Sequence, residues 1–191
     1  MKRILLIALL ASPLCTHAQA PAGAPAIAPG SAVDPAVSLN AMLDGTEKQM
    51  MGLVKAMPAD KYDFAPSAAI FVSTQKTEYT GVRTFGALVV HVAQANYGYG
   101  GRIGGLKPDV DPKTLATLKT KDEMVAALAA SFEFLHKAMG TVTAANAFES
   151  VRGPSTKITT AAGSVVHCAD EYGQMVEYLR MNGMVPPASQ R

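Results

Sequence analysis

Apolar side chains recur at every third or fourth position in several stretches of the chain, and this spacing is typical of α-helices with one buried face. The stretches cover about residues 35–56, 84–105, 120–139 and 160–182. The alternation that would indicate strands is weak everywhere except at residues 70–72, a segment too short to carry a sheet. The pattern therefore predicts an all-α protein, a four-helix bundle around one core.

The ends of the predicted helices carry residues that favour helix termini. Pro35 suits a first-turn position, and Pro58 stops the first helix. Thr120 and Glu123 have the spacing of a capping box. The second helix ends among five glycines within residues 98–105. Their spacing does not fit a dinucleotide-binding loop, and no Lys-Ser or Lys-Thr pair follows, so we interpret them as a helix terminus.

The segments between the helices differ in length and character. Residues 59–80 carry Pro66 and mixed polarity without a period, which predicts a long connection with room for a short helical turn. A polar loop with Gly153 and Pro154 precedes the fourth helix, and Gly183 follows that helix. The bundle is therefore expected to have one long connection, between its first two helices.

The N-terminus has the three-part layout of a secretory signal peptide. A basic start precedes an apolar run at residues 4–11 that is too short to span a bilayer, and small residues at 18–20 are typical of a cleavage site. Leu14 precedes Cys15, whereas a lipidation site requires a small residue there. We expect a signal peptide of residues 1–20, cleavage after Ala20, and export to the periplasm or the medium.

The rest of the chain divides into a linker and one domain. Residues 21–35 are mostly Ala, Pro and Gly and cannot bury enough surface to offset the entropy of ordering, which predicts a linker. Residues 36–191 are the predicted helical domain. They contain no apolar stretch of membrane-spanning length, so no membrane contact is expected after cleavage.

Charge and cysteine content exclude several classes of protein. The 191 residues include 17 basic and 15 acidic side chains, and cleavage would remove Lys2 and Arg3 and leave equal numbers. A neutral chain has no electrostatic attraction to nucleic acid or anionic lipid. Only Cys168 would remain after cleavage, which excludes a scaffold built on disulfides.

Three residues on the second and fourth predicted helices are candidate metal ligands. His167 and Glu171 are four residues apart, so they lie on one helix face a turn apart. His91 lies in the most apolar part of the second helix, and an inward orientation would complete a set of two histidines and one carboxylate. Such a set leaves coordination positions open for water or substrate. A helical His–Glu hydrogen-bonded pair, and a surface or core role for His91, explain the same spacing.

The chain also resembles a known family through several short motifs, of which the C-terminal run is the most specific. The motifs are Ala56-Met57-Pro58-Ala59-Asp60-Lys61-Tyr62 with Phe64-Ala65-Pro66, Arg83-Thr84-Phe85-Gly86 leading to His91, His167-Cys168-Ala169-Asp170-Glu171-Tyr172-Gly173-Gln174, Tyr178-Leu179-Arg180, and Gly183-Met184-Val185-Pro186-Pro187. From about residue 36 to the end, the chain is similar to the DinB-like (YfiT-type) superfamily of four-helix proteins regarded as metal-dependent enzymes.

The resemblance implies a bundle that holds a divalent metal ion on three histidines. His91 matches the first of these and His167 the second, whereas Glu171 stands where the family usually has the third. A carboxylate is an acceptable ligand for zinc, nickel, iron or manganese. Two interpretations remain: the site is retained with a changed charge, or it has lost its metal. The family is often dimeric, which implies a homodimer.

The functions that remain open differ in chemistry. The first is an exported metal-dependent hydrolase or transferase that acts on an unidentified small molecule. Some relatives use low-molecular-weight thiols, and export would separate this protein from that pool, which weakens the transferase version. The second is a non-catalytic metal-binding or stress-associated bundle, and the third a purely structural bundle with a relict site. No independent general base stands out in the sequence.

Three further polar residues receive weaker interpretations. His136 lies near the edge of the apolar stripe of the third helix and is interpreted as a boundary or surface residue, although a hydrogen bond that supports a metal ligand is left open. Gln174 is one turn after Glu171 and either lines a pocket or holds a neighbouring group. Cys168 lies one residue off the His167 face and is expected to pack as a small apolar residue.

Overall fold

The computed structural model describes residues 27–70, 72 and 74–190. The predicted signal peptide and the first part of the predicted linker lie outside the described residues. Contacts divide the chain after Ala32 into two units, and every helix named below belongs to the second unit, which begins at Val33. In this described part of the chain, no helix combines the length and apolar character needed to cross a membrane.

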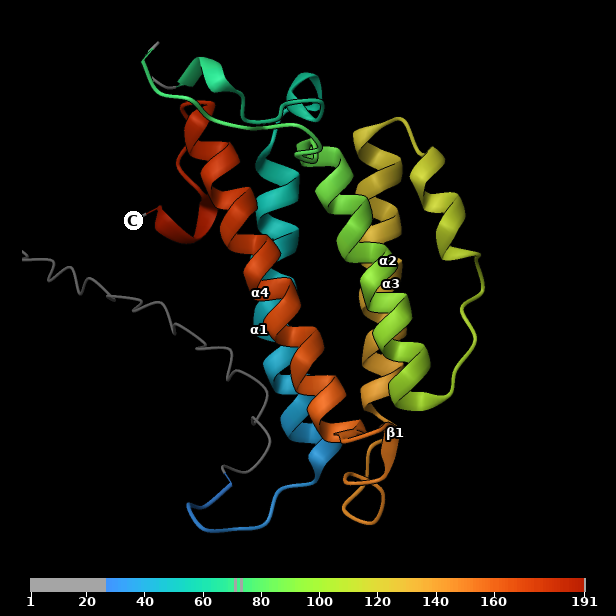
Figure 1. Ribbon diagram of the computed structural model, residues 1–191. Helices are drawn as coiled ribbons and strands as arrows, with labels where there is room; N and C mark the ends of the chain where they lie inside the picture. Colours follow the sequence, from blue (N-terminus) through green and yellow to red (C-terminus); the bar gives the residue numbers. More distant parts are fainter. Residues whose placement is uncertain (1–26, 71, 73, 191) are drawn as a thin grey trace, which may run out of the picture. The chain divides into compact units, whose positions relative to one another are not determined.

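Long α-helices make up most of the second unit. They are α1 (Pro35–Ala56), α2 (Phe85–Gly104), α3 (Lys121–Met139) and α4 (Lys157–Met181). Short 3₁₀ turns lie between or after the helices, among them η3 (Pro112–Thr117) after α2 and η4 (Pro187–Ser189) after α4. The α1 and α4 helices lie side by side, as do α2 and α3, and α2 also packs against α4 and α1 against α3 (Figure 1). The predicted all-α, four-helix bundle is confirmed.

Hydrogen bonds at the helix N-termini determine where α3 and α4 begin. Thr120 and Glu123 form the predicted capping box, in which the Glu123 carboxylate accepts the Thr120 N–H at 2.9 Å and the Thr120 hydroxyl accepts the Glu123 N–H at 3.2 Å. The α4 helix begins at Lys157, three residues earlier than predicted, because Thr156 and Thr159 accept each other's backbone N–H groups. A cap of this kind stabilises a helix by about 1 kcal/mol.

The connection between α1 and α2 is long, as predicted, and is tied to both helices. It contains two short 3₁₀ turns, η1 (Ala59–Lys61) and η2 (Ala68–Ile70). The buried Tyr62 donates its hydroxyl to the Val54 carbonyl at 2.6 Å and accepts the Gly86 N–H on its own carbonyl at 2.8 Å. The Phe85 N–H donates to the Phe64 carbonyl at 2.9 Å. The start of α2 is thereby fixed to the end of α1.

The polar loop before α4 contains a small hairpin that the sequence pattern did not predict. Strand β1 (Ser150–Arg152) pairs antiparallel with β2 (Ser155–Thr156), at the end of the bundle opposite the α1–α2 connection (Figure 1). Gly153 takes the positive φ of 54° that the tight turn requires. Strands this short leave too few positions for alternation to be detected in the sequence.

The core lies between the four helices, and glycines let two of them approach closely. The largest fully buried side chains are Phe85, Phe132, Leu43, Met50, Leu53, Met57, Ile103, Leu128, Leu135, Met139, Met175 and Leu179. A Cβ atom on Gly100 would lie 2.6 Å from a ring carbon of Phe134. The α2 helix therefore continues through the first glycines of its C-terminal cluster and ends at Gly104, with Gly105 as its left-handed cap at φ 65°.

Candidate metal centre

The structure brings the three candidate ligands together between α2 and α4. The Nε2 atom of His91 lies 3.3 Å from Nε2 of His167 and 3.3 Å from Oε1 of Glu171. The Nε2 atom of His167 lies 3.8 Å from the same carboxylate oxygen. Three potential ligand atoms from two helices therefore face one small volume.

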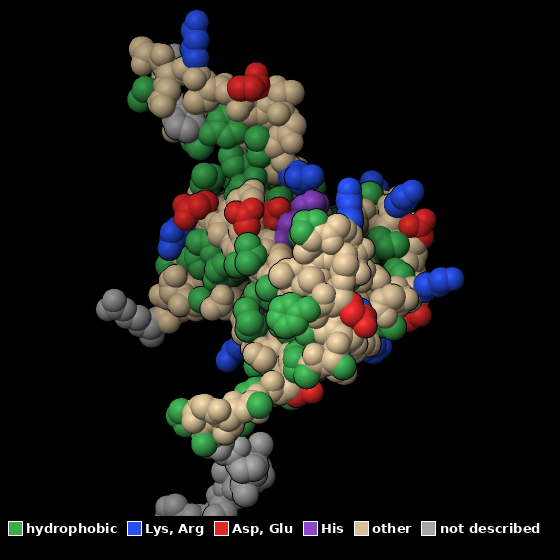
Figure 2. Space-filling view, turned by 60° about the horizontal axis from the view of Figure 1, so that its bottom comes forward, with side chains coloured by type: hydrophobic (Ala, Val, Ile, Leu, Met, Phe, Trp, Pro, Cys, Tyr) green, Lys and Arg blue, Asp and Glu red, His purple; other side chains and the backbone are tan. Residues whose placement is uncertain are grey.

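Helix geometry and burial explain this convergence. His167 and Glu171 are one turn apart on α4, and α2 packs against this face of α4 and supplies His91. The side chain of Glu171 is only 8% exposed, whereas those of His91 and His167 are 30% and 22% exposed. The carboxylate thus lies inward and the imidazoles lie between it and solvent. Figure 2 shows a face on which a histidine side chain reaches the surface beside acidic and basic side chains.

Two atoms of this cluster have unmet hydrogen-bonding capacity. Within the described residues, Nδ1 of His167 and Oε2 of Glu171 are buried and have no hydrogen-bond partner. A buried carboxylate is costly, by several kcal/mol, unless a cation or hydrogen-bond donors compensate its charge. The protein's own groups do not provide that compensation in full.

The donor set and its spacing fit a divalent metal ion. Ligand atoms about 2.0–2.2 Å from a tetrahedral zinc ion lie roughly 3.3–3.6 Å from one another. The observed separations are 3.3, 3.3 and 3.8 Å, so small side-chain adjustments would suffice. Imidazole nitrogen and carboxylate oxygen are ligands that zinc, nickel, iron and manganese accept. The residues present therefore fit the implied ion.

Burial sets the protonation chemistry around the cluster. It lowers the pKa of His167 below its ordinary value, and this outweighs the opposite effect of the Glu171 charge. A neutral imidazole is the form that binds a metal ion. Burial, with a contribution from the Glu171 charge, raises the pKa of the Cys168 thiol to about 12 and also raises the pKa of Tyr178.

A cavity of about 320 Å³ is lined in part by His91. Its wall combines apolar and polar side chains from α2, the segment before it, the η3 region and α3: Arg83, Thr84, Ala87, Val90, His91, Gln94, Ala116, Leu118 and Met124. The Gln94 amide donates to the Pro112 carbonyl at 2.9 Å and so holds the η3 region against α2. A small molecule in this cavity would contact His91 directly.

A second histidine–carboxylate group, which the sequence interpretation did not identify, lies between α1 and α3. His136 Nε2 lies 3.0 Å from Glu47 and 3.6 Å from Asp44, and its Nδ1 lies 2.6 Å from the Asn40 side-chain oxygen. His136 is partly buried, which fits the predicted boundary position. Asn40, Asp44 and Glu47 recur at fours and threes on α1, and this polar stripe is the signal that could have suggested the group.

The two remaining candidates take no part in the cluster. Cys168 is fully buried and its thiol donates to the side-chain oxygen of Asn96 at 3.4 Å, so the expected packing role is confirmed. Burial raises its pKa to about 12, which disfavours the thiolate form at neutral pH. Gln174 is exposed on α4, so it does not line an internal pocket.

Comparison with known proteins supports the resemblance noted in the sequence. The family model described as the DinB superfamily matches residues 42–179, from the first half of α1 to near the end of α4. This range includes all three clustered residues. A search of curated proteins finds no match to the chain.

Proposed function

The chain belongs to the DinB superfamily, and on this premise we propose that it binds one divalent metal ion through His91, His167 and Glu171. We further propose that the bound ion serves a metal-dependent hydrolase or transferase reaction on a small molecule. The basic, apolar and small-residue pattern of the N-terminus supports an exported protein, active in the periplasm or outside the cell.

The single observation that carries the metal proposal is the state of Glu171. Its carboxylate is buried, one oxygen faces two imidazole nitrogens, and the other oxygen has no partner among the described residues. A carboxylate left in this state without a cation would destabilise the fold. A bound ion compensates the charge and gives His91 and His167 a common partner.

The chemistry of the proposed reaction divides between the ion and the chain. When bound, a divalent ion of this class lowers the pKa of a coordinated water towards neutrality and polarises a substrate oxygen. Three protein ligands leave room for such a water or substrate, as catalytic zinc sites do. The apolar side chains of Val90, Leu118 and Met124 line part of the cavity beside His91.

The carboxylate in place of the family's usual third histidine changes the charge of the site. With two neutral histidines and one carboxylate, a divalent ion leaves the site with a net charge of about +1 rather than +2. This lowers the electrophilicity of the ion and favours harder, oxygen-preferring metals such as manganese or iron more than a site of three histidines would. Metal preference is therefore expected to shift away from that of relatives with three histidines.

A non-catalytic metal-binding bundle is the second candidate, and one observation favours it. Among the described residues, the histidines and carboxylates that lie within ligand distance of each other at this site are all used as ligands, and none is left as a general base. Binding of the ion would then be the end point, with the cavity beside His91 as an access route. Turnover separates the two candidates, whereas metal content does not.

The test is the metal content of the exported protein, purified without chelator or affinity tag. We expect about one zinc, nickel, iron or manganese per chain, and loss of this metal in His91→Ala. His136→Ala is the matched control, since it removes a histidine of similar burial from the other cluster. Absence of metal from the native protein, even after reconstitution with each ion, would overturn the proposal. Equal metal content in both variants would place the ion elsewhere.

A further inference from the structure

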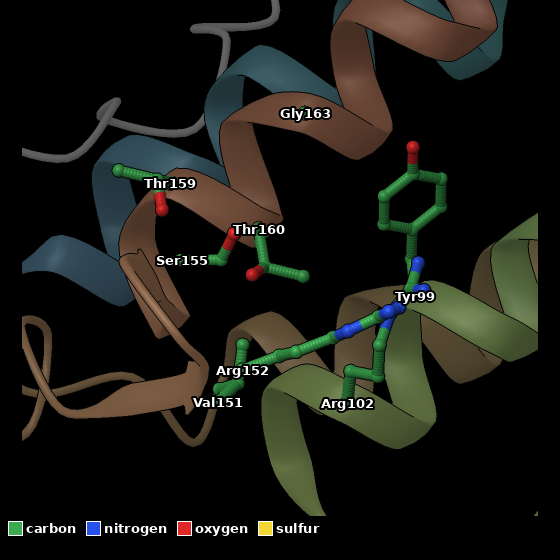
Figure 3. Close-up of a pocket in the computed structure, with 8 residues that line it drawn as sticks. All are labelled: Tyr99, Arg102, Val151, Arg152, Ser155, Thr159, Thr160 and Gly163. Carbon is green, nitrogen blue, oxygen red and sulfur yellow. The ribbon is translucent and has the colours of Figure 1, made fainter.

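A second cavity, of about 330 Å³, lies between the C-terminal part of α2, the β1–β2 hairpin and the first turns of α4. Figure 3 shows Arg152 reaching from the hairpin towards Arg102 on α2, next to Tyr99, with Ser155 and Thr160 on the side of α4. Two cationic side chains from elements far apart in sequence therefore line one hollow. We call the part formed by Arg102, Arg152 and Thr160 the anion pocket.

The two arginines of the anion pocket carry uncompensated charge. Within the described residues, neither Arg102 nor Arg152 forms an ion pair or a hydrogen bond, in contrast to Arg180, which pairs with Glu177 at 2.8 Å. Guanidinium groups stay charged at any working pH and match the oxygens of carboxylates and phosphates in two-pronged contacts. Two guanidinium groups beside each other repel. An oxyanion bound between them is attracted to both and removes this repulsion.

The buried wall of the anion pocket offers a hydrogen-bond donor without a partner. Thr160 is only 8% exposed, and its hydroxyl forms no hydrogen bond with another described residue. Threonines in helices commonly donate to a carbonyl of the preceding turn. Since the Thr160 hydroxyl does not, it is available to a ligand. The pocket thus combines charge with an oriented neutral donor.

The anion pocket is close to the candidate metal centre. The Arg102 guanidinium stacks over the Tyr99 ring at 4.6 Å, and the Tyr99 ring centre lies 5.9 Å from that of His167. Thr160 precedes His167 by seven residues on α4, which corresponds to about 10 Å along the helix. A molecule of modest length could therefore span the distance between the two places.

We propose that the anion pocket binds a carboxylate or phosphate group of the substrate, whose reacting group lies about 10 Å away at the metal centre. As a statement about the substrate, this inference rests on the proposed metal function. As a statement about oxyanion binding, it stands on Arg102, Arg152 and Thr160 alone. The substrate class is an elongated small molecule with an oxyanion at one end.

The first experiment measures thermal unfolding of the whole protein with inorganic phosphate against chloride at equal ionic strength. A site of millimolar affinity should raise the Tm by about 3–6 °C at about 10 mM phosphate. The rise should disappear in the double variant Arg102→Gln, Arg152→Gln and fall in Thr160→Val, which replaces only the hydroxyl, with a methyl group. Both arginines are exposed, so the double variant is expected to fold, and circular dichroism checks this.

Arg180→Gln is the control for general loss of positive charge, and it should keep the full rise. An equal rise in the double variant, or no rise in the native protein, would overturn the anion pocket. The measurement is repeated on His91→Ala. A phosphate response without metal binding would leave the anion pocket standing and sink the metal function. Metal binding without a phosphate response would leave the metal function standing and overturn the anion pocket.

The second experiment tests the link to the metal with linear dicarboxylates of increasing length and with acetate as the short reference. On metal-loaded protein, affinity should rise at least tenfold when the two carboxylates are about 10 Å apart. The gain should vanish in His91→Ala, which keeps the anion pocket but lacks a ligand of the metal centre. An affinity that does not depend on length would overturn the substrate role.

Discussion

Among the described residues, histidine and carboxylate side chains come together in two groups, His91, His167 and Glu171 between α2 and α4, and His136, Asp44 and Glu47 between α1 and α3. In the first, the carboxylate is buried, its second oxygen has no partner in the described structure, and two imidazole nitrogens face each other at 3.3 Å. In the second, both ring nitrogens of His136 lie within 3.0 Å of an oxygen, and the side chain of Asp44 is 73% exposed.

The difference shows that proximity of ligand types does not by itself identify a metal site. The group around His136 is satisfied by its own members and by solvent, so it gains little from an ion. The group around Glu171 is not satisfied by the described protein groups, and desolvation makes that expensive. The unmet capacity of buried atoms separates the two groups more clearly than distance does.

The two groups should differ most in zinc affinity when one carboxylate is removed from each. Glu171→Ala should weaken zinc affinity by at least about a hundredfold, beyond the usual loss for residues that only support ligands. Glu47→Ala should change it less than about twofold, because the surface group gains little from an ion. Competition with a fluorescent chelator measures both. Comparable small losses would mean that Glu171 is only a helix partner of His167.

General loss of stability must be separated from loss of the metal centre. Gly100→Ala would place a Cβ against the Phe134 ring and force α2 and α3 apart, with an expected loss of about 1–3 kcal/mol in the free energy of unfolding. Zinc affinity should change little, since the added Cβ meets Phe134 on α3, whereas His91 meets Glu171 on α4. Urea unfolding with chelator and the same zinc competition give the two numbers. A large fall in affinity would weaken any conclusion from Glu171→Ala.

The two groups should respond in opposite ways to an apolar replacement of the carboxylate in metal-free protein. Glu171→Leu removes a buried charge that lacks full compensation, so it should raise the free energy of unfolding by about 1 kcal/mol. The same variant should lose the stabilisation that zinc gives the native protein. Glu47→Leu should not stabilise, because it removes a satisfied partner of His136. Destabilisation by Glu171→Leu would show that the metal-free carboxylate is well accommodated.

The smallest effect is expected from His136 itself. His136→Ala loses a partly exposed interaction with Glu47 and the hydrogen bond to Asn40, which should cost about 1 kcal/mol or less. Metal content should be unchanged. Urea unfolding at low and high salt measures the cost, and the electrostatic part should shrink at high salt. Loss of metal in this variant would indicate that an ion binds between α1 and α3.

The sequence was sufficient for the elements whose signals are local. The apolar period, Pro35 and Pro58 located α1, and the Thr120–Glu123 box located α3. The start of α4 was misplaced because Thr156 and Thr159 form a box without the acidic residue that usually marks one. The hairpin was missed because its strands, of three and two residues, are too short for an alternating pattern to be detected.

The site was predictable only in part for a related reason. The four-residue spacing of His167 and Glu171 is visible along one helix, whereas the approach of His91 depends on how α2 packs against α4. Spacing alone left that approach open, and the resemblance to a family supplied it. The group around His136 joins α1 to α3 and has no motif of its own, so only the packed structure reveals it.

The hydrogen bonds that join Tyr62 to Val54 and Gly86 have a consequence for the rotation of α2 about its axis. Each residue of an α-helix turns the chain by about 100°, so a slip of one residue at the start of α2 would turn His91 away from His167 and Glu171. The bonds of Tyr62 therefore fix the rotation of α2 about its axis relative to α1. Insertions between residues 65 and 83 should leave the Tyr62–Gly86 hydrogen bond in place. One inserted residue between Gly86 and His91 should rotate the imidazole away from α4.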